Sequence, residues 1–542
     1  MRYAIGPMCI AAALAACTRA TRVDLSPPLA ASVPEASARQ AAVLDPEAGP
    51  PLSREEQLEH ALSRVTFGAR PADRDRLPRI GVAAFVEEQL HPKHIDDGRV
   101  NAELARFPLL QRSSAELLQQ LSAQQPARAA EEADSRMPPG KSRRGARLEI
   151  VSQLAQAKLL RAVESERQLQ EVMTDFWFNH FNVFAGKDNV AALLPSYEQA
   201  LRERALGNFR DLLVATAHSP AMLVYLDNWR SSTPRPPGGK GAAAAAARRH
   251  RGLNENYARE LLELHTLGVD GGYTQRDVVE VARCFTGWTV AEPKQDPRFV
   301  FRPGMHDRGV KHVLGYEISQ GGEDDGNAVL DLLARHPSTA RFISLKLSRR
   351  FVSDEPPEAL VRRAADTFLR SGGDIRSVLR TIFESPEFWS RRALRAKVRS
   401  PLELVVGSVR AVGARVDDPE ALAKAVARIG QPLFAAQPPT GYGDAADDWL
   451  APGAMLARID FGLALAAGEV PGVTVDLSPV SRDAPEPEVI LDRAAQRIGA
   501  AGLSQRTREY VLEQLRQAPP QPDVVAARAV GLLLGSPELQ RR

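Results

Sequence analysis

The chain has few of the residues that build the common catalytic and redox motifs. It contains three cysteines in 542 residues, and aromatic side chains make up 6% of it. It has no paired CxxC, no HExxH, no GxSxG and no Rossmann glycine pattern. The usual forms of the thioredoxin-like, zinc-protease, serine-hydrolase and dinucleotide-binding classes are therefore excluded.

An excess of one charge and a long apolar run are also missing. The chain has 70 basic and 67 acidic residues, a formal net charge of +3. Nucleic-acid-binding domains normally carry a marked basic excess, so we expect no nucleic-acid partner. No segment of the body reaches the roughly 20 apolar residues of a spanning helix, so we expect the body to be soluble.

The N-terminus reads as a targeting segment. Arg2 supplies a positive charge, Ala4–Ala13 is an apolar run, and Leu14–Cys17 resembles a bacterial lipobox. We therefore predict a lipoprotein signal peptide over 1–16 and acylation of Cys17, which would anchor the protein to a membrane. A plain secretory signal with a chance cysteine is the alternative. Thr18 favours a place in the bacterial envelope, at the outer membrane and facing the periplasm or the surface.

Composition divides the remainder of the chain. Residues 17–51 are rich in Pro, Ala and Ser, which predicts a flexible tether. Residues 52–542 are expected to form a single helical domain, interrupted by low-complexity loops at about 125–147 and 230–252. Cys284 would have no disulfide partner after processing, and its apolar surroundings predict a buried thiol.

Apolar residues recur at the three- and four-residue spacing of helices over most of the body. The sequence thus predicts a mainly α fold, a large multi-helix bundle. Two β-rich runs, Phe299–Arg302 and Val310–Leu314, add a small β-hairpin arm. The predicted helices are Glu55–Phe67, Val82–Leu90, Leu148–Ala162, Ser196–Thr216, Val278–Cys284, Thr339–Phe351, Glu358–Leu369, Ile375–Phe383, Pro401–Val412, Met455–Leu465 and Asp523–Leu534.

The stretch NENYARELLELHTLG predicts a helix with an acidic face. Asn254 is a favourable N-cap, and His265 falls on the apolar arc at about 100° per residue. The polar arc carries Glu255, Arg259, Glu260 and Glu263. One interpretation is a solvated face with ion pairs at helical spacing. The other is a helix that lines a polar cavity, to which Asp227 could add a carboxylate.

A second candidate lies in the aromatic segment Met173–Phe184. On a helical wheel His180 falls near the centre of an aromatic face, and Asn179 and Asn182 flank it. A buried, hydrogen-bonded imidazole is the structural interpretation. A desolvated histidine is also what a general base or a metal ligand requires.

A third candidate is His306-Asp307, followed by Lys311 and His312. At a hairpin tip His306 and Asp307 would point the same way and approach a site built elsewhere. The alternative is an exposed turn in which Asp307 serves only turn geometry. The segment Thr266–Asp277 superficially resembles a calcium loop but lacks two acidic ligands, so Thr274 and Asp277 are better interpreted as a helix cap.

Several of these segments together resemble the domain-of-unknown-function 1800 family from about Leu52 to the C-terminus. The words that carry the resemblance are FWFNHFNV (Phe176–Val183), NENYAREL from Asn254, FTGW (Phe285–Trp288), HDRGVK (His306–Lys311) and GQPLF (Gly430–Phe434). The resemblance implies a helical architecture but no reaction. Because family members are often encoded beside another exported protein, it also implies a protein partner.

We therefore expect an exported, lipid-anchored protein with a polar site suited to acid–base or metal-assisted hydrolysis. The candidate catalytic residues are His180, Glu255, Arg259, Glu260, His306 and Asp307. A divalent zinc, iron or manganese ion would bind His180, Glu260 and His306. The alternative is a non-catalytic envelope protein that binds or assembles a partner. The hydrolase requires these distant side chains to meet.

Overall fold

A computed structural model of the protein describes residues 50–123, 143–233, 252–483, 486–500 and 502–542. The predicted signal peptide, the predicted acylation site Cys17 and nearly all of the predicted tether lie outside these ranges, as does most of each low-complexity loop. The chain from Pro46 to Arg542 forms one compact unit. Within the described ranges no helix combines the length and the apolarity needed to cross a membrane.

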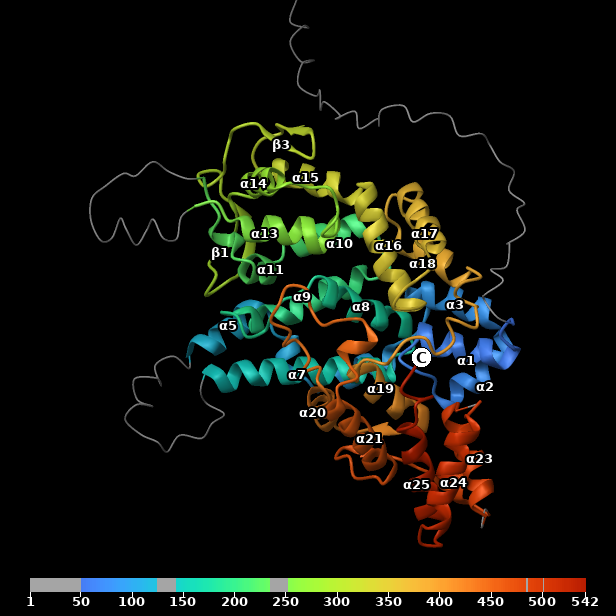
Figure 1. The fold of residues 1–542 in the computed structure, drawn as a ribbon. Helices are drawn as coiled ribbons and strands as arrows, with labels where there is room; N and C mark the ends of the chain where they lie inside the picture. The colour runs from blue at the N-terminus through green and yellow to red at the C-terminus, as the bar shows by residue number, and fades with distance from the viewer. Residues whose placement is uncertain (1–49, 124–142, 234–251, 484–485, 501) are drawn as a thin grey trace, which may run out of the picture. The chain divides into compact units, whose positions relative to one another are not determined.

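Helices dominate the described chain, so the predicted mainly α fold is confirmed (Figure 1). The first half contains α1 (Arg54–Val65), α2 (Pro71–Ile80), α3 (Val82–Leu90), α4 (Gly98–Leu104), α5 (Ser114–Ala123), α7 (Arg143–Glu164), α8 (Gln168–His180), α9 (Val190–Arg204), α10 (Phe209–Ala217), α11 (Pro220–Tyr225), α13 (Glu255–Glu260) and α14 (Gln275–Cys284). A π-helical turn, η5 (Leu261–Thr266), continues α13, and short 3₁₀ turns occupy η1 (Pro92–His94), η2 (Pro108–Gln111) and η4 (Asn228–Arg230).

The second half continues the helical pattern. It contains α15 (Asp324–Ala334), α16 (Pro337–Phe351), α17 (Glu358–Arg370), α18 (Ile375–Phe383), α19 (Pro401–Val412), α20 (Glu420–Ile429), η6 (Ala446–Asp448), α21 (Pro452–Ala466), α22 (Ser478–Ser481), α23 (Pro487–Ile498), α24 (Gln505–Arg516) and α25 (Pro522–Leu534). One apolar core cluster runs through this unit, from Leu62 of α1 to Leu534 of α25. Cys284 is fully buried, as predicted, and burial raises the pKa of its thiol to about 12.

Local side-chain chemistry explains where several helices begin. The Asn254 side chain accepts from the backbone N–H of Asn256 at 2.8 Å, so the predicted N-cap is confirmed. Thr274 and Asp277 form a capping box at the start of α14, which confirms that prediction too. Ser400 and Glu403 form another at the start of α19, in which the Glu403 carboxylate accepts from the backbone N–H of Ser400.

Some predicted helix bounds were wrong. The predicted helix Ser196–Thr216 is two helices, because the chain turns at Gly207 and the side chain of Asn208 caps α10 by accepting from Arg210 N at 2.9 Å. The aromatic helix α8 ends at His180, so Phe184, which the predicted segment Met173–Phe184 included, lies beyond the helix. Helix α7 begins at Arg143, within the segment predicted as a loop.

Small β-hairpins are present, as predicted, but the two β-rich runs do not pair with each other. Instead β1 (Trp288–Ala291) pairs with β2 (Arg298–Phe301), and β3 (Lys311–Val313) pairs with β4 (Tyr316–Ile318), both antiparallel. Positive φ angles at Leu314 (51°) and Gly315 (83°) make the tight turn that a two-residue hairpin needs. A third pair, β5 (Arg415–Val416) with β6 (Val473–Thr474), completes the strands of the described residues.

Candidate functional site

The acidic face of α13 is held by its neighbour α14. Glu255 and Arg259 form an ion pair at 3.6 Å, and both side chains also bond to the amide of Gln275 at 2.8 Å. Glu263, in η5, accepts a hydrogen bond from the Tyr273 hydroxyl at 2.9 Å. Glu255 and Arg259 thus contact each other and α14, and no hydrogen bond or ion pair joins them to His180.

Glu260 differs from the other members of that face. It is half-buried and forms no hydrogen bond or ion pair with any described residue. Burial and the nearby Glu263 raise the pKa of its carboxyl, whereas Arg259 opposes the shift. Asp227, the extra carboxylate considered from the sequence, pairs with Lys187 at 2.6 Å.

The π-helical turn η5 positions the end of this helix against α8. The hydroxyl of Thr266 donates to the carbonyl of Leu261 at 2.6 Å. Because a π-helical turn is wider than an α-helical turn, the residues after Glu260 point in other directions than a uniform α-helical wheel predicts. His265 is buried, and its backbone carbonyl lies 3.1 Å from Nε2 of His180. The two imidazole centroids are 6.3 Å apart.

His180 is buried in an aromatic cage, with 2% of its surface exposed. Because a carbonyl oxygen only accepts, Nε2 must carry the proton that bonds His265. The other nitrogen, Nδ1, is therefore a lone-pair acceptor, and it has no hydrogen-bond partner among the described residues. Burial, with further contributions from the charges of Lys346 and His265, holds the pKa of His180 well below its ordinary value. His180 is a neutral base with an unused lone pair.

The segment around His306 builds a separate buried cluster. His306 lies between β2 and β3, not at a hairpin tip as predicted, and it is buried, so the alternative of an exposed turn does not hold for it either. Its Nδ1 lies 2.8 Å from the carbonyl of Thr286, and its Nε2 lies 3.1 Å from Asp325. The Lys311 ammonium donates to Asp325 at 2.5 Å and also to the carbonyl of Asp307. We call His306, Lys311 and Asp325 the His306 cluster.

Asp307 and His312 lie at the margin of this cluster. The Asp307 carboxylate pairs with Arg283 at 2.9 Å and accepts from the Gly309 N–H at 2.8 Å. The guanidinium of Arg283 holds the pKa of Asp307 below its ordinary value. His312 is exposed, and its backbone N–H donates to Glu280. Asp307 therefore stabilises the loop.

The six predicted catalytic residues do not share one site. His180 contacts the η5 end of the acidic helix, but the charged face of that helix bonds elsewhere, and His306 bonds within its own cluster. Across the described ranges no group of three or more His, Cys, Asp and Glu side chains could hold a metal ion. The set His180, Glu260 and His306 is thus not assembled as a metal site, because each residue belongs to a different packing environment.

A cavity of about 260 Å³ opens beside His180 instead. We call it the lysine pocket. Four distant segments line it: α8 with Asp175, Asn179 and His180; α16 with Lys346, Arg349 and Arg350; the start of α19 with Ser400 and Glu403; and the loop that contains Gln431, Tyr442 and Asp444.

The two asparagines beside His180 hold the loop of the pocket. The Asn179 side chain donates to the Tyr442 carbonyl and accepts from the Tyr442 N–H, both at 2.8 Å. Gly441 has a φ of 71°, and a Cβ there would come within 2.5 Å of Asn179. Asn182 donates to the carbonyls of Ala436 and Pro438. The asparagines of the FNHFN word therefore fix the loop opposite His180.

The charges that line the lysine pocket are unequally compensated. Asp175 pairs with Lys158 at 2.6 Å, Asp444 pairs with Lys397 at 3.4 Å, and Glu403 pairs with Arg350 and Arg542. Lys346 and Arg349 form no hydrogen bond or ion pair with any described residue. The pocket therefore presents two uncompensated positive charges to a ligand.

Lys346 is the most distinctive of these groups. Its ammonium lies 5.6 Å from the centroid of the Phe342 ring, one helical turn earlier on α16. Burial lowers the pKa of Lys346 to about 8, with Arg349 adding to the shift and Asp444 opposing it. A considerable fraction of this amine is therefore unprotonated near neutral pH, which is the form that acts as a base or a nucleophile.

Sequence reasoning did not identify Lys346, Arg349 or the loop at Tyr442. The spacing of Phe342 and Lys346 on a predicted helix was the available signal, since the pair is typical of a lysine that packs on an aromatic ring. It did not distinguish this lysine from one on an ordinary helix surface, because the pocket depends on a loop about a hundred residues away.

The fold and the pocket define a class: a mainly α-helical protein with small hairpins and an uncompensated lysine in a cavity. The chain belongs to the family described as "Protein of unknown function (DUF1800)", whose family model matches residues 60–541. No curated protein and no solved structure matches the chain. The family that the sequence words indicated is thus confirmed, and its description names no reaction.

Proposed function

We propose that the protein is an exported, lipid-anchored acid–base enzyme that acts on a small anionic substrate in the lysine pocket. The observation that supports this most strongly is the Lys346 amine, which has no ionic partner among the described residues and a pKa near 8. Burying an amine without a counter-charge costs stability, so such an arrangement is typical of a functional group.

The roles of the side chains follow from their charge states. Arg349 and the protonated fraction of Lys346 would attract a carboxylate or another small oxyanion. The neutral fraction of Lys346 would take a proton from a bound water or from the substrate, and would return it to the leaving group. His180 has a free lone pair on Nδ1, so it would accept a hydrogen bond and orient a polar group in the pocket. Hydrolysis is the simplest reaction of this kind.

The reaction can be tested with two matched esters, the 4-nitrophenyl monoester of succinate, which is anionic, and that of butyrate, which is neutral. We expect the protein to hydrolyse the succinate ester faster, with a rate that rises as pH increases through about 8. Lys346→Met should lower that rate by about 100-fold or more, because general-base catalysis typically contributes 10²–10⁴. Lys424→Met is the matched control, since Lys424 is a surface lysine of α20.

Equal rates for the Lys346→Met variant and the unchanged protein would refute catalysis by this amine. Succinate binding that persists in a protein without turnover would favour the alternative, a non-catalytic envelope protein that binds a partner or ligand. His180→Phe separates the two roles further, because it should weaken turnover without removing the positive charge that attracts the anion.

The anchor belongs to the same proposal and rests on the Leu14–Cys17 word. Cys17→Ala should move the protein from the membrane fraction to the soluble fraction, because the acyl chains would be lost. Fractionation of cells with an immunoblot measures this. An unchanged membrane fraction would show that the attachment does not depend on Cys17.

A further inference from the structure

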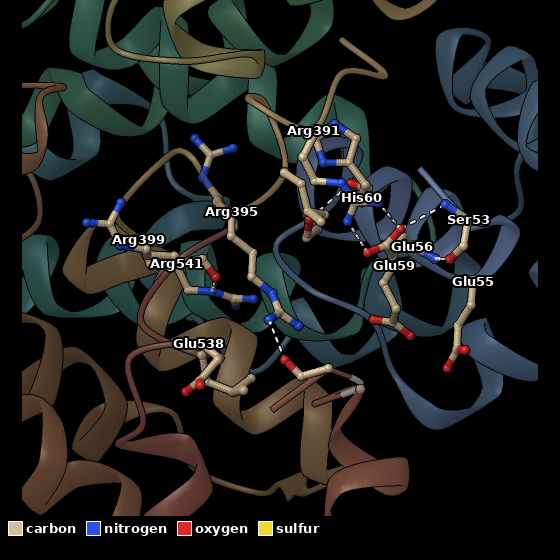
Figure 2. Close-up of a pocket in the computed structure, with 16 residues that line it drawn as sticks. Ser53, Glu55, Glu56, Glu59, His60, Arg391, Arg395, Arg399, Glu538 and Arg541 are labelled. Carbon is tan, nitrogen blue, oxygen red and sulfur yellow. Dashed lines mark hydrogen bonds and ion pairs between the residues drawn. The ribbon is translucent and has the colours of Figure 1, made fainter. Parts of the chain in front are cut away.

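A second cavity, of about 510 Å³, lies between α1 and the last residues of the chain (Figure 2). We call it the arginine pocket. The basic side chains that line it are Arg391, Arg395, Arg399, Arg541 and Arg542. Figure 2 shows Arg395, Arg399 and Arg541 on one side of the cavity, and Glu55 and Glu56 of α1 with its N-cap Ser53 on the other.

Backbone pairing brings these distant arginines together. Val398 and Arg541 form an isolated antiparallel bridge. The Arg399 N–H donates to the carbonyl of Gln540 at 2.9 Å, and the Arg542 N–H donates to the carbonyl of Lys397 at 2.8 Å. The Arg399 side chain also donates through Nε to the carbonyl of Arg541 at 3.2 Å. The cationic wall is therefore built by the fold.

Four carboxylates line the cavity: Glu55 is exposed and forms no ion pair with these arginines, and the other three are engaged elsewhere or with only one arginine. Glu56 binds Arg391 through both of its oxygens. Glu59 pairs with Arg74 at 2.9 Å, outside the arginine set. Glu538 accepts from Ser504 and Thr507. Among the described residues, no carboxylate lies within ion-pair distance of the guanidinium groups of Arg399 and Arg541.

Further positive charge is buried behind the wall. Arg64, Arg350 and Arg542 are all buried, and Glu403 is the carboxylate that pairs with the last two. Arg64 is fully buried, donates through Nη2 to the carbonyl of Ala393 at 2.5 Å, and has no hydrogen-bond partner for Nε and Nη1. Burial lowers the pKa of Arg399 and of Arg542 to about 10.

Such an excess of buried cations is costly, because a desolvated charge without a partner loses several kcal/mol of hydration. A bound anion would offset that cost. Guanidinium groups bind tetrahedral oxyanions and carboxylates with paired hydrogen bonds, and more than one unpaired arginine suits an anion of more than one charge.

We propose that the arginine pocket binds the phosphate group of a phosphorylated ligand, independently of the reaction at the lysine pocket. The cavity is larger than a phosphate ion, so it would admit part of the group to which the phosphate is attached. That group can be a soluble metabolite-sized solute or the headgroup of a phospholipid, and the two share the same recognition by Arg399 and Arg541.

Calorimetric titration of the full-length protein in detergent, at constant ionic strength, tests the proposal with sn-glycerol 3-phosphate and with short-chain dihexanoyl phosphatidylglycerol. We expect at least one ligand to bind, and Arg541→Met to weaken it about 10-fold or more. Binding of glycerol 3-phosphate would assign a soluble phosphorylated ligand. Binding of the lipid alone would assign a headgroup. No binding of either, or equal binding by the variant, would overturn the proposal.

Three variants complete the test. Arg541→Lys keeps the charge and should retain part of the affinity, which distinguishes recognition from loss of structure. Arg302→Met removes an exposed arginine between the two hairpins and should leave the affinity unchanged. Lys346→Met should also leave it unchanged. If Lys346→Met abolished phosphate binding, the anion would occupy the lysine pocket and the arginine pocket would lose its support.

Discussion

The lysine pocket and the His306 cluster contain the same two residue types in opposite states. In the His306 cluster, Lys311 and His306 both bond to one carboxylate, Asp325. Their other bonds go to the backbone carbonyls of Asp307 and Thr286, to the Thr286 hydroxyl and to each other. In the lysine pocket, Lys346 has no such carboxylate and His180 retains an unused nitrogen. A buried lysine beside a histidine is therefore a structural element when its charge is compensated, and a chemical one when it is not.

Electrostatics express the same difference. Burial alone would raise the pKa of Asp325, but hydrogen bonds from His306 and Lys311 hold it below its ordinary value. In the lysine pocket Asp444 opposes the effect of burial only in part, and the pKa of Lys346 falls to about 8. Compensation keeps Asp325 charged, whereas its absence leaves Lys346 partly neutral.

Breaking the His306 cluster should have the largest effect on stability. Lys311→Met would leave Asp325 buried without its cation, and removing one partner of a buried pair typically costs about 3–5 kcal/mol. Urea unfolding measures the loss. The double variant Lys311→Met, Asp325→Asn should lose less than the single one, since no uncompensated charge then remains. A single variant as stable as the unchanged protein would contradict a structural role.

Acid should destabilise the side of the lysine pocket that holds histidines. Burial, with a contribution from Lys346, lowers the pKa of His265 to about 3. As pH falls below 6.5, His265 binds a proton in the unfolded chain but not in the folded protein. The free energy of unfolding therefore decreases as pH falls from 6.5 to about 3. The slope approaches about 1.4 kcal/mol per pH unit for one group. His265→Phe should reduce the slope of unfolding free energy between pH 6 and 4, and an unchanged slope would show that His265 titrates normally.

Lys346→Met should have a smaller effect on stability than Lys311→Met, of about 1 kcal/mol or less, because no carboxylate loses a partner. Its effect on reactivity should be large. Trinitrobenzenesulfonate, an anionic amine reagent, should modify Lys346 with a rate that is half-maximal near pH 8, and peptide mass spectrometry measures the site. Modification of Lys346 and the surface residue Lys424 with the same pH dependence would mean that burial does not activate this amine.

Local chemistry made much of the fold predictable. Helices α3, α18 and α19 have the predicted bounds, and the side chains of Asn254 and Thr274 cap the helices that follow them, as predicted. Strand pairing was less predictable, because it depends on where the chain turns. The positive φ angles at Glu292 and Leu314 mark the turns within the two observed hairpins, and β propensity does not locate them. The helical spacing of apolar residues also continues from α9 into α10, so it does not reveal that one helix ends and the next begins at the Asn208 cap.

The site was less predictable than the fold for a physical reason. Sequence words identify His180 and its asparagines, but the lysine pocket depends on contacts among α8, α16 and the loop at Tyr442. The charge of Lys346 is significant only because the nearby carboxylates have other partners, and the sequence does not record which charges are paired. For the same reason, the sequence indicated the acidic face of α13 as part of a site. In the structure, Glu255 and Arg259 of that face bond to Gln275.

The smallest expected effect concerns that acidic face. Glu255 and Arg259 are partly exposed and lie 3.6 Å apart, and exposed pairs at this helical spacing contribute about 0.3–0.5 kcal/mol. Glu255→Gln should therefore change the unfolding free energy by no more than that, and high salt should remove the difference, because solvent ions screen exposed pairs. It should also leave ester hydrolysis unchanged. A large loss of turnover in Glu255→Gln would instead return this face to the active site, since its stabilising contacts are too weak to cause such a loss through unfolding.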